Sequence, residues 1–185
     1  HPSTVLRPTH PTPLVCMPEH KLKLFEKASI DMVILLPFTK EFSEQSADQF
    51  LRKVSHAVPI QTLILGSDAH IGKNREGDQS TVTALAEHLG FSVEYFPDRL
   101  IDGRRISSNL IRESIRQGEL KRAEALLGRA YSIYSKVQKG NGKGATIGFP
   151  TANLDVHGLC LPPLGVYAVS LFDGVTEYHG VANLG

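Results

Sequence analysis

The chain has 185 residues, enough for one sizeable core or two smaller ones, and its 20 basic and 19 acidic residues give a formal net charge of +1. A charge so close to zero argues against a nucleic-acid partner, because proteins that bind nucleic acid carry a strongly basic face. No apolar run approaches the roughly 20 residues of a membrane span, and the first residues lack the apolar part of a signal peptide, so we expect a cytoplasmic protein without a membrane partner.

Helix and strand patterns alternate between Pro18 and about Gly128. Apolar periodicity predicts helices from Pro18, after a capping box of Ser46 and Gln49, and over 80–89 with Gly90 as the stop. A continuous apolar run predicts a strand at 32–36, buried on both faces, and a second buried strand is predicted at 62–66 and a further strand at 91–96. Strands that alternate with helices predict a parallel, doubly wound sheet, which binds ligands beyond the carboxyl ends of its strands.

The turn density rises after Leu127, because ten of the sixteen glycines lie in 128–185. Tyr131, Ile133 and Val137 alternate with polar residues and predict a half-buried strand. A second strand over 166–172 is followed by Asp173 and Gly174, a dipeptide that predicts a hairpin with a two-residue turn. We therefore expect two domains, 1–128 and 129–185, and the second to be a small antiparallel β-barrel.

Two stretches of the first domain carry candidate phosphate ligands. Asp68 and His70 follow a predicted strand, where an open sheet binds ligands, although a solvated loop explains their spacing equally well. Ser107 or Ser108 caps a predicted helix whose Leu110, Ile111 and Ile115 face the core. The positive end of this helix, with Arg104, Arg105 and Arg112 nearby, suits a phosphate, but an ordinary capped surface helix is the alternative.

The glycine-rich stretch 140–153, GNGKGATIGFPTAN, fits neither a Walker P-loop nor a dinucleotide fingerprint. Thr151 and Asn153 lie two residues apart, so in an extended chain their hydroxyl and amide point to one side, as a partial magnesium shell completed by ATP requires. Lys143 adds a mobile positive charge. The alternative is a mobile hairpin end. Cys16 and Cys160 form no metal or redox motif and are expected to be small buried residues.

Several motifs resemble a known enzyme family. The run at 148–154, with 165–169 and 180–185, is similar to the riboflavin kinase barrel. A second set of motifs is similar to the FMN adenylyltransferase module: His1-Pro2 with Val5-Leu6, Gly66-Ser67-Asp68, residues 105–108 with Ile111-Arg112, and residues 126–129. Joined in this order, they resemble the bifunctional bacterial FAD synthetases over nearly the whole chain. The resemblance implies a Rossmann-like nucleotidyltransferase domain followed by the kinase barrel, both incomplete here.

The resemblance implies FAD biosynthesis, with ATP, riboflavin, FMN and FAD as substrates or products and Mg²⁺ as cofactor. In the kinase part, Thr151 and Asn153 would hold magnesium and the ATP phosphates while the ribityl 5′-hydroxyl of riboflavin attacks the γ-phosphoryl group. The kinase ATP site would comprise Lys143, Gly144, Gly148, Pro150, Thr151 and Asn153.

In the adenylyltransferase part, the FMN phosphate would attack the α-phosphorus of ATP. The resemblance implies that Arg105, Ser107 and Ser108 grip the nucleotide phosphates, with Asp68 and Arg112 in the same nucleotide site. Asn109 departs from the family's usual threonine or serine, and Asp68 stands where the family has an asparagine or an acidic residue.

Two catalytic parts of the family are expected outside this sequence: the glycine-rich histidine motif before His1 and the glutamate base of the kinase after Gly185. We therefore expect an internal fragment of a two-activity enzyme that is inactive by itself. Two alternatives stay open. One is a non-catalytic nucleotide- or flavin-binding module, and the other is a barrel that acts as an RNA or protein adaptor. The sequence makes no prediction of oligomeric state.

Overall fold

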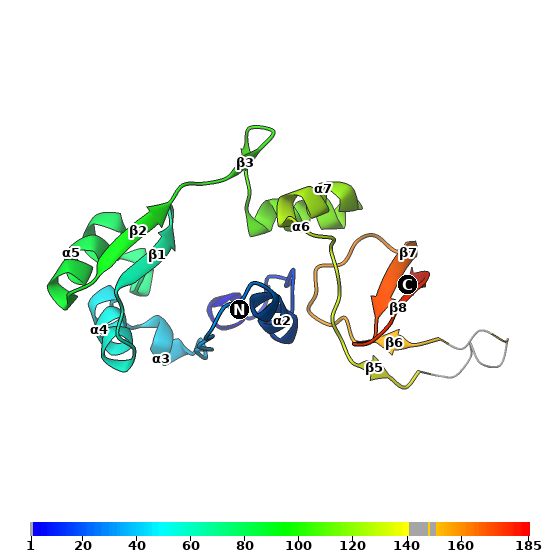
Figure 1. Ribbon diagram of the computed structural model, residues 1–185, viewed down its shortest axis with the longest axis horizontal. Helices are drawn as coiled ribbons and strands as arrows, with labels where there is room; N and C mark the ends of the chain where they lie inside the picture. The colour runs from blue at the N-terminus through cyan, green and yellow to red at the C-terminus, as the bar shows by residue number, and fades with distance from the viewer. Residues whose placement is uncertain (1, 141–147, 149–150) are drawn as a thin grey trace. The chain divides into compact units, whose positions relative to one another are not determined.

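The computed structural model describes residues 2–140, 148 and 151–185, and the chain forms two compact units, His1–Thr12 with Met32–Ile106 and Pro13–Asp31 with Ser107–Gly185. The first unit contains α1 (Pro2–Leu6), α3 (Lys40–Ser43), α4 (Ala47–Ala57), β1 (Thr62–Gly66), the 3₁₀ helix η1 (Lys73–Arg75), α5 (Gln79–Leu89), β2 (Ser92–Phe96), β3 (Leu100–Ile101) and β4 (Arg104–Arg105). The second contains α2 (Pro18–Lys27), α6 (Ser108–Arg116), α7 (Leu120–Leu127), β5 (Val137–Gln138), β6 (Asn153–Leu154), β7 (Gly165–Phe172) and β8 (Glu177–Leu184) (Figure 1). These compact units are not separated at the predicted domain boundary between residues 128 and 129. That boundary stays a prediction.

The first unit is built around a parallel pair of strands. β1 and β2 pair in register from Thr62 opposite Ser92 to Gly66 opposite Phe96, as the alternation of strands and helices predicts. The core that they share with α4 and α5 consists of Leu51, Val82, Ala86 and Phe91, against which the inward residues of the strands pack. Figure 1 shows both helices beside the strand pair.

The prediction that 62–66 is a buried strand is correct for its position and wrong for its burial. Leu63 and Leu65 are half-buried against the helices, whereas Ile64 is 60% exposed, and on β2 Phe96 is 57% exposed. Burial alternates along both strands because α4 and α5 cover a single face of the pair. Successive apolar residues such as Leu63, Ile64 and Leu65 therefore do not require cover on both faces of the strand.

Three predicted helices are confirmed with the expected end signals. Pro18 occupies the first turn of α2, and Ser46 and Gln49 form both hydrogen bonds of a capping box at α4. Gly90 ends α5 in the left-handed conformation. Asp78, which the sequence analysis did not single out, caps the start of α5 by accepting from Thr81 N at 2.9 Å, and this bond lowers the pKa of its carboxyl to about 2.

The strand predicted at 32–36 is wrong. This stretch forms no regular element and has no strand partner within the described residues, and Met32 and Leu35 are 70% and 63% exposed. A strand needs a neighbour for its peptide groups, and in the described part of the first unit β1 pairs only with β2. Apolar composition therefore indicates a tendency to be buried, and pairing decides whether a strand forms.

Residues 70–78 form a constrained loop beneath the start of α4. Ile71 and Gly77 exchange two backbone hydrogen bonds, of 3.0 and 2.9 Å, and Lys73 N donates to Gln45 O at 2.8 Å. A carboxylate oxygen of Glu76 accepts from Ala47 N at 3.0 Å. At Gly77 a Cβ would lie 2.6 Å from Ile71 O and 2.8 Å from the Ala47 side chain, so the loop depends on a glycine for this close approach.

The second unit contains the helical hairpin of α6 and α7. Leu110, Ile111 and Ile115 are buried on α6, as predicted, and Ser107 caps the helix by accepting from Leu110 N at 3.2 Å. The two helices pack against each other, as Figure 1 shows. Gly128 follows α7 in the left-handed conformation.

Segments from opposite ends of the sequence meet in this unit. Leu14 N donates to Gly158 O and Cys160 N donates to Leu14 O, both at 2.8 Å. The Tyr131 hydroxyl donates to Cys160 O at 2.7 Å, and burial raises the pKa of Tyr131 to about 12. Cys160 is buried as expected, whereas Cys16 is only half-buried, because it precedes the exposed start of α2.

The β-strands of the second unit form two antiparallel pairs. β7 and β8 pair over their full lengths, which confirms the predicted hairpin, but its turn runs from Asp173 to Thr176 and centres one residue later than predicted. The strand predicted through Tyr131 and Ile133 is wrong there, because only Val137 and Gln138 find a partner, in β6. The described residues thus show the pairs β5–β6 and β7–β8, not a closed barrel.

We expect Gly77→Ala to lower the free energy of unfolding by about 1 to 3 kcal/mol, because the new methyl group would overlap Ile71 O and Ala47. Gly66→Ala is the matched control, since the closest atom to a Cβ there is an Asp68 carboxylate oxygen at 3.8 Å. Urea unfolding followed by circular dichroism measures both. Equal midpoints for the two variants would contradict the close approach described for the loop.

Candidate functional site

A polar cluster lies at the carboxyl ends of the parallel pair, where an open α/β sheet binds ligands. Ser67 and Asp68 follow β1, Asp98 follows β2, and Arg105 ends β4. Arg105 Nη2 lies 2.6 Å from an Asp68 carboxylate oxygen, and Arg105 Nε lies 3.0 Å from Asp98 Oδ1. The Ser67 hydroxyl donates to the same Asp98 oxygen at 2.8 Å. The structure therefore brings together two of the predicted residues, Asp68 and Arg105.

A tight hairpin delivers Arg105 to this cluster. β3 and β4 pair antiparallel, and the two turn residues Asp102 and Gly103 have φ of 50° and 72°. Positive φ at both central residues is what a type I′ turn requires, and Asp-Gly is among its preferred sequences. Ile106 N donates to Arg99 O at 2.9 Å and closes the base of the hairpin. The backbone of Arg105 is thereby fixed on both sides.

The charges in the cluster support one another. The hydrogen bond from Arg105 lowers the pKa of Asp68, and the bond to Asp68 raises the pKa of Arg105. The side chains of Arg105 and Asp68 are 42% and 59% exposed. An anionic ligand can therefore reach the guanidinium from solvent.

His70 and Arg75 lie on the loop beside Asp68. His70 Nδ1 lies 2.8 Å from Asp68 O and 2.9 Å from Arg75 Nη2. Since one ring nitrogen either donates or accepts, only one of these contacts is a hydrogen bond in each tautomer. Arg75 has a φ of 60° and is held there by the constrained loop, so a second cation stands close to the cluster.

The remaining predicted residues of the adenylyltransferase site belong to the second unit. Ser107 uses its hydroxyl to cap α6, and Ser108 is the first residue of that helix. Arg112 is 8% exposed: its Nε donates to Pro13 O at 2.7 Å and its Nη1 to Asn109 Oδ1 at 2.9 Å. Burial lowers the pKa of this guanidinium. Arg112 thus ties α6 to the segment that begins at Pro13.

The predicted kinase site is described in part. Lys143, Gly144 and Pro150 lie outside the described residues. Gly148 is in a turn with a φ of 83°, and Thr151 and Asn153 are exposed. The Asn153 side chain lies so close to Gly140 that a Cβ there would overlap it. Gly140 therefore leaves the space that the amide occupies.

Thr151 and Asn153 offer a hydroxyl oxygen and an amide oxygen, donor types that Mg²⁺ accepts. In the described part of the chain no three His, Cys, Asp or Glu side chains gather as a metal cluster. Magnesium often keeps several waters and binds through substrate phosphates with one or two protein ligands, so the two exposed residues fit this ion.

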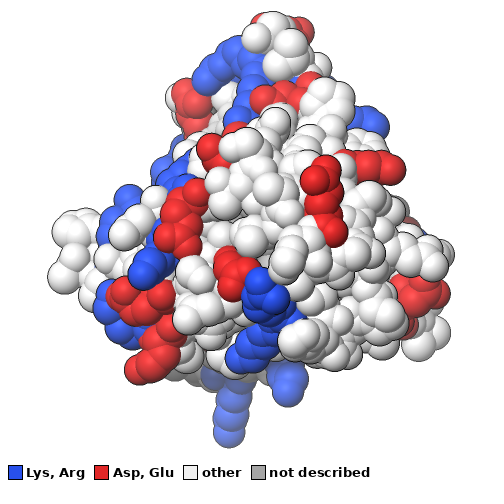
Figure 2. Space-filling view, turned by 90° about the vertical axis from the view of Figure 1, so that its left-hand side faces the viewer, with Lys and Arg blue, Asp and Glu red and all other residues white. Residues whose placement is uncertain are grey.

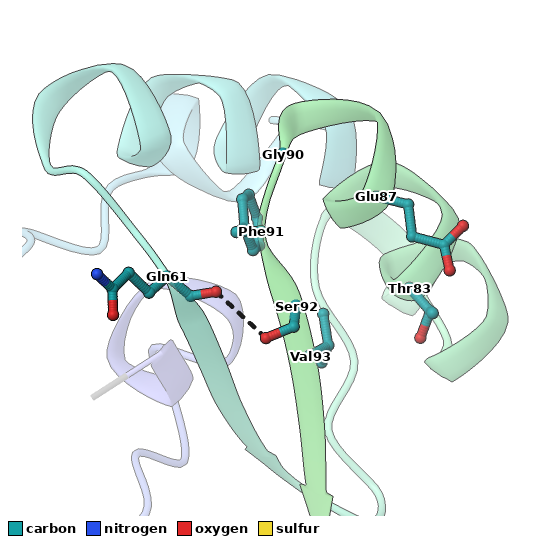
Figure 3. Close-up of a pocket in the computed structure, with 7 residues that line it drawn as sticks. All are labelled: Gln61, Thr83, Glu87, Gly90, Phe91, Ser92 and Val93. Carbon is teal, nitrogen blue, oxygen red and sulfur yellow. Dashed lines mark hydrogen bonds between the residues drawn. The ribbon is translucent and has the colours of Figure 1, made fainter.

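A hollow of about 470 Å³ lies at the opposite, amino end of the strand pair. Figure 3 shows it between α5, which contributes Thr83 and Glu87, and the start of β2, where Ser92 Oγ donates to Gln61 O at 3.2 Å. Its lining contains one acidic side chain and no arginine or lysine. We place the candidate anion site at the Arg105 cluster, because that end of the strands presents the cations.

The surface charge agrees with the balanced composition. On the face of the described residues that Figure 2 shows, basic and acidic side chains are intermixed, with wide uncharged areas between them. No helix within the described ranges is both long enough and apolar enough to span a bilayer.

Sequence reasoning missed Asp98 and the hairpin that carries Arg105. Asp98 lies far from Asp68 in sequence, and only the register of β1 and β2 makes the two neighbours. The hairpin had a usable signal in Asp102-Gly103, because the same dipeptide at 173–174 predicts the hairpin of β7 and β8, although the turn there centres one residue later.

Comparisons with known proteins match both parts of the chain. The FAD synthetase family model matches residues 1–110 and the riboflavin kinase model residues 127–185. The bifunctional riboflavin kinase/FMN adenylyltransferase of Haemophilus influenzae is 40% identical over 168 residues, 89% of this chain and 54% of that protein. The enzyme of the same name from Listeria monocytogenes is 34% identical over 191 residues, 100% of this chain and 59% of that protein.

The chain thus spans a little more than half the length of these curated relatives, 54% and 59%. Among solved structures, one described as the macrolide-efflux protein from Streptococcus pneumoniae superposes with a TM-score of 0.84 at 26% identity, covering 100% of this chain and 60% of that one. We take from this likeness the fold alone.

We expect Arg112→Ala to lower the free energy of unfolding by about 1.5 to 3 kcal/mol, the range for hydrogen bonds to a charged group. The substitution leaves Pro13 O and Asn109 without their 2.7 and 2.9 Å contacts. Arg122→Ala is the control, because Arg122 makes an exposed pair with Glu119 on α7. Chemical denaturation measures both. Equal stability of the two variants would show that the hydrogen bonds of Arg112 to Pro13 O and Asn109 Oδ1 do not stabilise the fold.

Proposed function

The chain belongs to the FAD synthetase family, whose model covers residues 1–110, and from that premise we propose that the protein acts in FAD biosynthesis. The first activity is ATP-dependent phosphorylation of riboflavin to FMN, in the part that matches the riboflavin kinase family. The second is transfer of the adenylyl group of ATP to FMN, which yields FAD and pyrophosphate. ATP and flavins are then the small-molecule partners, and no nucleic acid takes part.

The observation that carries the adenylyltransferase part is the Arg105 cluster at the carboxyl ends of β1 and β2. An arginine on a rigid hairpin, half-exposed and aimed at strand ends, supplies the positive charge that a polyphosphate requires. Phosphoryl and nucleotidyl groups carry most of their charge on oxygens, so positioning and charge neutralisation by such groups supply most of the catalysis. The proposed role of Arg105 is to bind the nucleotide phosphates.

The proposed roles of Ser107, Ser108 and Arg112 follow from their places on α6. The start of a nine-residue helix has unpaired N–H groups and a positive dipole end, which favour a phosphate at Ser107 and Ser108. Arg112 is committed to Pro13 O, so we give it a supporting role, in which it fixes the helix start without touching the nucleotide.

In the kinase part, the proposed ligands of ATP and its magnesium ion are Thr151 and Asn153. Magnesium, when bound, neutralises the charge that develops on the transferred phosphoryl group. The residues themselves orient the phosphates: the Thr151 hydroxyl can donate or accept, and the Asn153 amide fills the space that a Cβ at Gly140 would occupy. Lys143, Gly144, Gly148 and Pro150 complete the proposed ATP site.

The second candidate is a flavin- or nucleotide-binding module without catalysis. It shares the ligand chemistry of the first candidate and differs only in turnover. Because this chain is expected to be inactive by itself, a single-turnover assay of the full-length protein separates the two: incubation with riboflavin, ATP and Mg²⁺ and then chromatography of the flavins shows FMN or FAD for the enzyme, and unchanged riboflavin for the module.

We expect Thr151→Ala to weaken magnesium-dependent ATP binding by about 1.5 to 3 kcal/mol, because the lost hydroxyl would form a hydrogen bond to a charged partner. Titration calorimetry of the chain with ATP and Mg²⁺ measures the change. Thr151→Ser keeps the hydroxyl and should restore most of the affinity.

Thr176→Ala, in the turn between β7 and β8, controls for a general effect of losing a threonine. Affinities that do not differ among wild type, Thr151→Ala and Thr176→Ala would rule out the ligand role of Thr151.

A further inference from the structure

Two carboxylates hold Arg105 in different ways. Asp98 bonds its Nε and Asp68 bonds its Nη2, so neither contact uses Nη1. The side chain of Asp98 is 36% exposed and that of Asp68 is 59% exposed. The carboxylate on Nε is thus the more enclosed of the two, and the one on Nη2 faces solvent.

Asp98 is itself fixed by its surroundings. Its Oδ1 accepts from the Ser67 hydroxyl at 2.8 Å as well as from Arg105. Ser67 is tied at both backbone groups, because its N donates to Phe96 O at 3.0 Å and its O accepts from Gln79 Nε2 at 2.7 Å. A chain of hydrogen bonds therefore connects Arg105 to the ends of both strands and to the first residue of α5.

Asp68 has no such tether through its carboxylate. Among the described residues, the contact that the structure gives this group outside its own loop is the 2.6 Å ion pair with Arg105. An exposed ion pair contributes little net stability, because water solvates both partners well. An incoming phosphate, which can accept two N–H bonds from a guanidinium, replaces a carboxylate in this position at small cost.

We propose that Asp98 is a positioning residue that holds Arg105 by its Nε and presents its terminal nitrogens to a polyphosphate, while Asp68 is the exchangeable counter-ion that the polyphosphate displaces. This inference rests on the proposed role of Arg105 in nucleotide binding. Arginine has several rotatable bonds, and a side chain that is already ordered loses less entropy when it binds. Orientation by Asp98 thus raises affinity, although its negative charge alone would lower it.

The test uses the binding of inorganic triphosphate to the chain, measured by calorimetry. Asp98→Ala and Asp98→Asn remove the same charge, but only the asparagine keeps an oxygen that accepts from Arg105 Nε. We expect Asp98→Ala to bind about 3- to 10-fold more weakly than wild type, the size of one ordered long side chain, and Asp98→Asn to match or exceed wild type. Asp68→Asn and Asp68→Ala should both bind more tightly, because each removes the competing carboxylate.

A second variant and a second readout guard against misfolding. Ser67→Ala removes one tether of Asp98 and leaves both charged groups in place, so it should weaken binding in the same direction as Asp98→Ala but less. The Arg105 Nε–H signal in a ¹⁵N NMR spectrum should exchange with water faster in Asp98→Ala and stay protected in Asp98→Asn.

Two contrary results separate this inference from the proposed function. If Arg105→Gln binds triphosphate as tightly as wild type, the nucleotide site is misplaced and the inference falls with it. If Arg105→Gln weakens binding while Asp98→Ala and Asp98→Asn tighten it equally, Arg105 keeps its role and Asp98 acts only through its charge, which overturns the inference alone.

Discussion

The parallel register of β1 and β2 is the constraint on which the candidate site depends. Because Gly66 stands opposite Phe96, the residues that follow each strand begin at the same level, and Ser67 N extends the ladder by bonding Phe96 O. Asp68 and Asp98 are therefore neighbours although they belong to different loops. A slip of one residue would reverse the faces of one strand and separate the two carboxylates. The core formed with α4 and α5 specifies that register, since it buries only the inward residues.

The candidate site also shows how a protein with almost no net charge can present an arginine to solvent at a fixed place. Arg105 is surrounded by two acidic side chains, so it does not act as a bare positive charge at the surface. Its position is fixed instead: a hairpin with a tight Asp-Gly turn fixes the backbone of Arg105, and hydrogen bonds fix its side chain. The amino-acid composition does not reveal local geometry of this kind. A formal net charge of +1 is therefore compatible with the proposed phosphate-binding role.

Local signals in the sequence predict helices α2, α4, α5 and α6 and the paired strands β1, β2 and β7, but not α7 or the hairpin of β3 and β4. Capping residues at Ser46 and Ser107 and the stop at Gly90 act within a few residues, and each lies where it was expected. The run at 32–36 failed because strand formation depends on a partner that composition does not reveal. The position of Arg112 near the start of a helix predicts a contact with the nucleotide. In the structure its Nε instead donates to the carbonyl oxygen of Pro13, a residue distant in sequence. Asp98 was missed for the same reason, since its partners are set by the register of two strands.

The discontinuous second unit bears on how the chain can be divided. Pro13–Asp31 falls inside the stretch that matches the FAD synthetase model, yet it belongs to the unit that holds the riboflavin kinase match, and it is bonded there through Leu14 to Gly158 and Cys160. The two matched regions are consequently not two separate structural units. An expression clone that starts at the kinase match would omit α2 and leave the backbone groups of residues 158 and 160 open to solvent.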